Sequence, residues 1–171
     1  MLCVIAKIDA DAKARLRRIQ QLAERFHLPP RPLYGHVTLA TYLGDEEDAF
    51  IASCKLKLST QPAFQIRYER LDVFSATSIL VAVPAKSHDL VTLQRSLAFG
   101  WTHHLDRWTQ PEVWCPHTTL LHSEAHDLAA VAEALRPQFV PFLAQVNQIE
   151  FSRVYENSYE IIDSFTLTAA P

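Results

Sequence analysis

The chain has 171 residues, of which 49% are hydrophobic and 20% are charged, and its formal net charge is −3. This length and composition suffice for one compact domain with an apolar core, while the charge excludes the basic surface that long duplex nucleic acid requires. The three cysteines, Cys3, Cys54 and Cys115, are scattered and odd in number, which argues against a disulfide framework and favours a reducing cytoplasm. The apolar start of the chain is too short for a signal peptide or a membrane span, so we expect a cytoplasmic protein.

The first half of the chain predicts a strand, a helix, a second strand, a second helix and a third strand. Residues 2–8 are rich in valine and isoleucine, which is typical of a buried strand. Asp9 can cap the helix that follows, and its apolar residues recur at helical spacing as far as Phe26. The prolines at 29, 30 and 32 end this helix. The remaining elements are a strand over 36–43, a helix from the acidic run at 45–48 to residue 58, and a long strand over 63–75.

The second half predicts the same order of elements. They are a strand over 78–83, a helix capped by Ser87 or Asp89, a strand over 113–121, a helix over 127–137, and strands over 143–154 and 159–167 joined as a hairpin. The first strands of the halves, centred near Ile5 and Val81, lie 76 positions apart. Matching offsets over a whole half indicate duplication of one unit. We therefore expect a single domain over residues 1–171, with repeat lobes of about 1–76 and 77–171.

Two short stretches carry the most specific signal, His36-Val37-Thr38-Leu39 and His117-Thr118-Thr119-Leu120, and their histidines lie 81 positions apart. Each stretch lies in an expected strand, where alternate side chains point to the same face. The histidine and the threonine of each stretch are therefore about 6.6 Å apart at the backbone, and both can reach one phosphate-sized group. Two imidazoles and two hydroxyls at one cleft could perform acid–base chemistry on a phosphodiester without a metal.

The same residues allow three alternatives to acid–base chemistry. Either histidine alone is more simply a hydrogen-bonded residue of the core or of a sheet edge, but coincidence accounts poorly for the duplicated pair. A Cys–His nucleophile at Cys115 is a second alternative. A metal site is a third. No glycine-rich phosphate loop is present, which argues against nucleotide triphosphate chemistry of that type. The candidate metal ligands are His103, His104, His117, His122 and His126.

With one such motif in each half, the chain resembles the 2H phosphoesterase superfamily, whose best-known branch is the 2′-5′ RNA ligase or RNA 2′,3′-cyclic phosphodiesterase. The resemblance spans nearly the whole chain. Pro116 precedes His117 as is usual for the motif, whereas Gly35 precedes His36 in the first copy. The resemblance implies an α/β (α+β) fold of two lobes with pseudo-twofold symmetry, in which two antiparallel sheets face a central cleft and the helices lie outside.

The resemblance also implies roles for the four motif side chains. By analogy with the RNA branch, His36 would be the acid that protonates the leaving ribose oxygen, and His117 would be the base that activates water. The sequence itself gives no physical reason for that order. Thr38 and Thr119 would donate hydrogen bonds to the non-bridging phosphate oxygens.

Four further residues are weaker candidates for substrate binding. Arg31 lies near the first motif and could neutralise a phosphate. Tyr42 shares the face of His36 if side chains alternate regularly along the strand, and there it could stack on a base. Arg67 and Tyr68 belong to the long strand that could cross the cleft. The alternative for each is an ordinary solvated or packing role.

From these observations we expect a metal-independent phosphodiesterase, without a cofactor, that hydrolyses 2′,3′-cyclic phosphate ends of RNA or small nucleotides and could also catalyse 2′-5′ ligation. The alternatives are a 2H-type enzyme acting on another cyclic nucleotide or an ADP-ribose derivative, and a non-catalytic module that binds nucleotides or RNA ends. The expected partner is a small nucleotide or an RNA end, with no long duplex nucleic acid and no membrane. We expect a monomer.

Overall fold

The computed structural model, which describes residues 1–28, 32–155 and 158–169, has strands and helices in the expected order. The elements are β1 (Leu2–Ile8), α1 (Ala10–Leu22), β2 (His36–Tyr42), α2 (Glu47–Leu58), β3 (Phe64–Phe74), β4 (Ile79–Pro84), α3 (His88–Ala98), β5 (Thr118–His122), α4 (Leu128–Leu135), β6 (Phe142–Val154) and β7 (Tyr159–Thr166). The expected mixed α/β class with antiparallel pairing is confirmed, and β6 and β7 pair antiparallel as expected, while their expected turn at 156–158 falls on residues of which 156 and 157 lie outside the described ranges.

Helix and strand starts follow from individual side chains. Asp9 accepts a hydrogen bond of 2.9 Å from a backbone N–H in the first turn of α1, and Ser87 and Asp127 cap α3 and α4 in the same way. These bonds satisfy N–H groups that have no partner within a helix. Strand β5 begins at Thr118, later than the expected residue 113, because Pro116 has no N–H to donate to a neighbouring strand.

The seven strands form one hydrogen-bonded sheet in the order β2-β1-β6-β3-β4-β5, with β7 paired to β6. The resemblance implied two sheets, but antiparallel pairing of β3 with β6 joins the strands of both halves into one. Strand β6 comes from the second half and also pairs with β1, while β3 comes from the first half and also pairs with β4. Each end of the sheet therefore combines two strands of one half with the third strand of the other.

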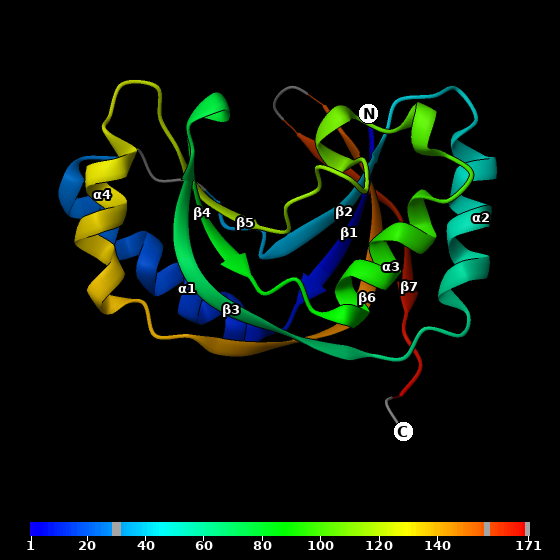
Figure 1. The fold of residues 1–171 in the computed structure, drawn as a ribbon, viewed down its shortest axis with the longest axis horizontal. Helices are drawn as coiled ribbons and strands as arrows, with labels where there is room; N and C mark the ends of the chain where they lie inside the picture. Colours follow the sequence, from blue (N-terminus) through cyan, green and yellow to red (C-terminus); the bar gives the residue numbers. More distant parts are fainter. Residues whose placement is uncertain (29–31, 156–157, 170–171) are drawn as a thin grey trace.

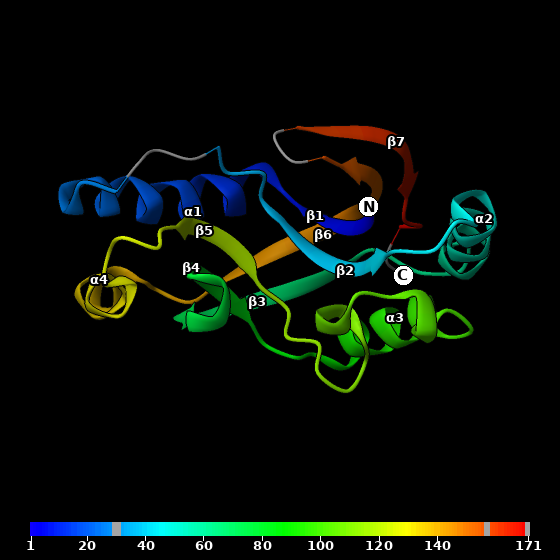
Figure 2. The same ribbon diagram turned by 90° about the horizontal axis from the view of Figure 1, so that it is seen from above.

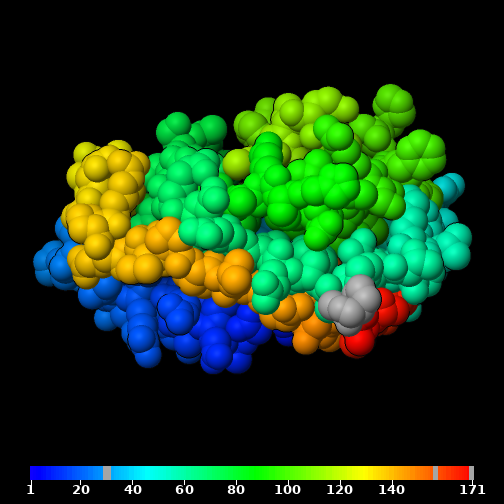
Figure 3. All heavy atoms as spheres, turned by 60° about the horizontal axis from the view of Figure 1, so that its bottom comes forward, coloured from blue at the N-terminus to red at the C-terminus, as the bar shows by residue number. Residues whose placement is uncertain are grey.

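The helices form two groups, each with one member from each half. Helices α1 and α4 lie at one end of the molecule and α2 and α3 at the other (Figures 1 and 2). Helix α1 contacts β5 and α3 contacts β2, so each of these helices packs against the motif strand of the other half. Figure 3 shows the orange residues of β6 between the blue N-terminal region and the green region of β3. One apolar core runs through all of these elements. Within the described residues, no helix is long and apolar enough to cross a bilayer.

Candidate active site

The two motif strands, β2 and β5, are the two ends of the sheet order, yet their edges contact each other. The Thr118 hydroxyl donates a hydrogen bond of 2.7 Å to the backbone carbonyl of His36. Because its one proton is used there, the same hydroxyl accepts the 2.5 Å bond from the Tyr68 hydroxyl. The indole N–H of Trp114 donates to the backbone carbonyl of Thr38 at 2.9 Å. Side chains of the second half therefore form hydrogen bonds with the backbone of the first motif.

The residue between histidine and threonine in each motif faces the protein interior. Val37 is fully buried and Thr118 is 2% exposed. Since side chains alternate along an extended chain, the histidine and threonine of each motif point to the opposite face, where all four are half-buried. This geometry favours convergence of the two imidazoles on one side of the joined edges.

The surroundings of His117 favour its neutral form. Its Nδ1 lies 2.9 Å from the backbone carbonyl of Cys115, and since a carbonyl only accepts, Nδ1 carries the proton and Nε2 is left as the acceptor. The ring of Phe74 packs on the imidazole edge to face, with centroids 4.9 Å apart. Burial lowers the pKa of His117, outweighing the bond to Cys115, which raises it. A neutral imidazole whose Nε2 can accept a proton is what a general base requires.

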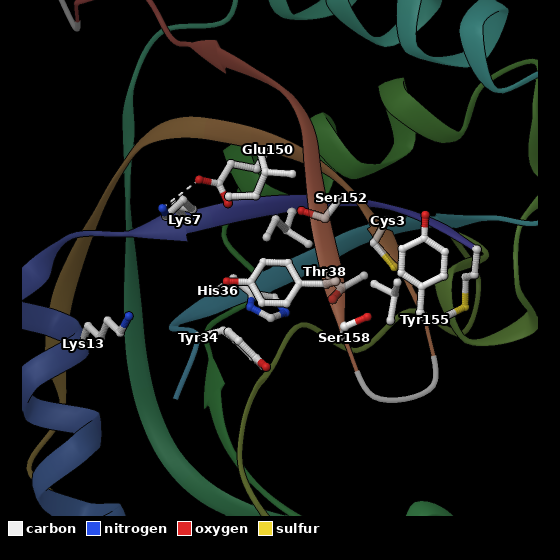
Figure 4. A pocket seen from close by; sticks show the side chains of 15 residues that line it. Cys3, Lys7, Lys13, Tyr34, His36, Thr38, Glu150, Ser152, Tyr155 and Ser158 are labelled. Atoms are coloured by element: carbon white, nitrogen blue, oxygen red, sulfur yellow. Dashed lines mark ion pairs between the residues drawn. The ribbon is translucent and has the colours of Figure 1, made fainter. Parts of the chain in front are cut away.

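A pocket of about 470 Å³ lies beside His36 and Thr38, and its walls come mainly from β1, β2, β6 and β7. In Figure 4, His36 and Tyr34 lie near each other at this pocket, and Lys13 extends from α1 on one side of them. His117 is not among the residues that line this pocket. The two histidines therefore have different surroundings, an open pocket for His36 and an aromatic contact for His117.

Both motif strands contain a β-bulge at the leucine that follows the threonine. The pairing of β2 with β1 skips Leu39, and the pairing of β5 with β4 skips Leu120. The side-chain amide of Gln20 in α1 donates to the Leu120 carbonyl at 2.7 Å. In α3, the amide of Gln94 donates to the carbonyls of Thr109 at 2.8 Å and Leu39 at 3.4 Å. Both glutamines are buried, so each bulge carbonyl is bound by a helix of the other half.

The bulge shows that the expectation for Tyr42 was wrong. Regular alternation would place Tyr42 on the face of His36, but the extra residue at Leu39 reverses the alternation. Tyr42 is 1% exposed and stacks on Phe50, with ring centroids 4.5 Å apart. Its ring therefore belongs to the core and cannot contact a ligand.

The other binding candidates lie away from the pocket or outside the described residues. Tyr68 is fully buried, and burial raises the pKa of its hydroxyl, which keeps its proton and serves as a donor to Thr118. Arg67 is exposed on β3 and does not line the pocket beside His36. Arg31 belongs to the part of the chain that is not described. Within the described ranges, no three His, Cys, Asp or Glu side chains gather as metal ligands would.

The backbone conformation at residue 35 explains why glycine, and not the usual proline, precedes His36. Gly35 has a φ of +69°, whereas proline fixes φ at about −65° and cannot replace it in this backbone. A Cβ atom at Gly35 would lie 3.0 Å from Cγ of Lys13. The departure from the usual proline thus accompanies a close approach of the Lys13 side chain to the motif.

Known proteins share both the sequence pattern and the fold of this chain. The family model described as the 2′-5′ RNA ligase superfamily matches residues 8–157. Similar solved structures include TT0787 of Thermus thermophilus, with a TM-score of 0.73, 19% identity and coverage of 98% of both chains. E. coli LigT complexed with 3′-AMP has a TM-score of 0.60, 18% identity and coverage of 98% of this chain and 96% of that one. LigT complexed with phosphate has a TM-score of 0.59, 16% identity and the same coverage. No curated protein matches the sequence significantly. At these identities the solved structures establish a shared fold.

Proposed function

The chain belongs to the 2′-5′ RNA ligase superfamily, and on this premise we propose that it is a metal-independent phosphodiesterase acting on 2′,3′-cyclic phosphate ends of RNA or small nucleotides. The observation that carries the proposal is the bond from Thr118 to the His36 carbonyl, which ties the two His-x-Thr motifs edge to edge. The 3′-AMP and phosphate complexes of LigT support a small phosphorylated ligand.

The proposed reaction uses one imidazole as base and the other as acid. Nε2 of His117 accepts a proton from water, and the water oxygen attacks phosphorus. The bond from phosphorus to one ribose oxygen breaks, and protonated His36 gives that oxygen its proton. The hydroxyls of Thr38 and Thr119 donate hydrogen bonds to the non-bridging oxygens, where negative charge develops. The product is a nucleoside or RNA end with a single phosphomonoester.

The surroundings of the two histidines support this assignment of roles. Water needs little room and a neutral base, and His117 is half-buried under Phe74 with its pKa lowered. The leaving ribose needs much more room, and the 470 Å³ pocket adjoins His36. Attack and departure roughly in line at phosphorus require the two groups on opposite sides of it, as motifs from two opposed strand edges can provide.

Turnover of a nucleoside 2′,3′-cyclic phosphate in excess chelator tests the proposed function. We expect release of the nucleoside monophosphate at the same rate with and without EDTA, because only imidazoles and hydroxyls take part. Loss of activity in EDTA that added metal restores would contradict metal independence. Saturable binding without turnover would favour the non-catalytic module, and turnover restricted to other cyclic nucleotides or ADP-ribose derivatives would favour another branch of the superfamily.

The pH dependence of kcat/KM follows from the lowered pKa of His117. A base must be neutral, so kcat/KM should fall as the pH drops, and the midpoint of this fall should lie below the ordinary histidine value of about 6.5. Replacing Phe74 with alanine should expose the imidazole and move this midpoint upward. Phe99→Ala is the matched control, because that ring is 79% exposed. A midpoint above 6.5, or a midpoint that does not change in Phe74→Ala, would contradict the inference that burial lowers the pKa of His117.

A further inference from the structure

The pocket beside His36 contains two lysines in different electrostatic surroundings. Lys7 lies 2.7 Å from the carboxylate of Glu150, whose side chain is 6% exposed, so these two charges neutralise each other. Lys13 is half-buried at the pocket wall, and it has no carboxylate partner within the described ranges of the chain. Of the two lysines, Lys13 therefore carries a positive charge that the described residues do not neutralise.

The side chain of Lys13 lies close to the first motif, in the space that Gly35 leaves open. Its Cγ and Cδ atoms lie 3.0 and 3.1 Å from the place where a Cβ of residue 35 would be. Only a glycine, at this positive φ, leaves that space open. In Figure 4 the ammonium group of Lys13 extends beyond this contact toward His36. Its charge is thus directed at ligand space next to the acid of the proposed reaction.

The remaining wall of the pocket suits a nucleoside. Tyr34 and Tyr159 form an edge-to-face pair with centroids 4.8 Å apart, and they are 41% and 44% exposed. Tyr155, which is 49% exposed, lies farther along the same wall. Exposed aromatic rings beside polar groups are the surfaces on which unpaired bases stack.

We propose that Lys13 binds a second phosphate of the substrate, one nucleotide unit away from the phosphate on which His36 and His117 act. The inference rests on the proposed function and narrows its substrate class. An RNA end, or a nucleoside 2′,3′-cyclic phosphate that also has a 5′-phosphate, supplies the second anion. A plain nucleoside 2′,3′-cyclic phosphate does not.

The test compares uridine 2′,3′-cyclic phosphate with the same compound bearing a 5′-phosphate. Wild-type protein should prefer the 5′-phosphorylated compound by about 10-fold in kcat/KM, as expected for one charge-assisted contact at a partly exposed site. Lys13→Met should reduce this ratio to about one, and Lys13→Arg should keep most of it. Lys86→Met, the same charge change on an exposed lysine outside the pocket, should keep the wild-type ratio. A ratio that is near one in wild type, or unchanged in Lys13→Met, would overturn the inference.

Binding separates this inference from the proposed function. If wild-type protein turns over neither compound, the proposed function fails. Calorimetric titration with uridine 3′,5′-bisphosphate and uridine 3′-monophosphate then still tests whether Lys13 binds a second phosphate. Tighter binding of the bisphosphate by about 10-fold, lost in Lys13→Met and kept in Lys86→Met, would support the second-phosphate site. Equal binding of the two compounds by wild-type protein would refute it.

Discussion

Replacing either motif histidine with alanine should lower kcat by about 10²–10⁴-fold, which is the usual contribution of one positioned acid or base. In the proposed mechanism, His117→Ala removes the proton acceptor for the attacking water, and His36→Ala removes the proton donor for the departing ribose oxygen. Because the two act in one step, the double variant should be little worse than either single variant. The measurement is single-turnover hydrolysis of a nucleoside 2′,3′-cyclic phosphate, with folding checked by circular dichroism.

A change of leaving group assigns the two roles. A nucleoside phosphodiester with p-nitrophenolate as leaving group needs no proton on the departing oxygen. On this compound His36→Ala should lose much less activity than His117→Ala, whereas on the cyclic phosphate the two losses should be similar. His122→Ala is the control, because this histidine is exposed at the end of β5. A larger loss for His36→Ala than for His117→Ala on the activated compound would reverse the assignment.

The buried glutamines should matter both for stability and for turnover. Gln20→Met and Gln94→Met each remove an amide donor while nearly keeping the side chain's shape. Each leaves a buried carbonyl at a motif bulge without that partner, which should destabilise the fold by about 1–3 kcal/mol. Because the bulge follows directly after the histidine and threonine that we propose as catalytic, a small shift there should also lower kcat by about 10-fold or more. Urea unfolding and kcat, measured where every variant is folded, report the two effects.

Gln21→Met provides the matched comparison for this pair. It makes the same chemical change one position along α1, on a side chain that is exposed. Its stability and kcat should stay at wild-type values. If Gln20→Met and Gln94→Met destabilise the fold yet leave kcat untouched, the glutamines only join helix to strand and do not position the motifs.

The order of elements could be predicted from the sequence because apolar periodicity and capping residues act locally. The class of fold, the hairpin of β6 and β7 and the start of α1 at Asp9 all follow from such signals. The single sheet could not be predicted, because which strand pairs with β3 depends on contacts between residues far apart in the sequence.

The errors at the site have two physical causes. Tyr42 was misplaced because a bulge at Leu39 breaks the period of two on which the expectation rested. A signal was available in the spacing, since Thr38 is followed by a polar Thr41 three positions later, not two. Tyr68 was a ligand candidate because its strand passes near the motifs, but its hydroxyl forms a hydrogen bond with Thr118 in the protein interior.

The residues that sequence reasoning missed act through neighbours that are distant in the chain. Lys13 approaches the first motif only because α1 packs beside Gly35. Gln20 and Gln94 lie 74 positions apart, one in a helix of each half, but only the structure shows that both are buried. Their partners, the bulge carbonyls, could be identified only once the strand register was known.

A crystal structure of the protein with inorganic phosphate tests most directly whether both imidazoles serve one anion. We predict a single phosphate whose oxygens lie within hydrogen-bond distance of Nε2 of His36 and Nε2 of His117, with the Thr38 and Thr119 hydroxyls on the remaining oxygens. Phosphate bound to one imidazole only, or the two rings facing separate spaces with no anion between them, would contradict this mechanism.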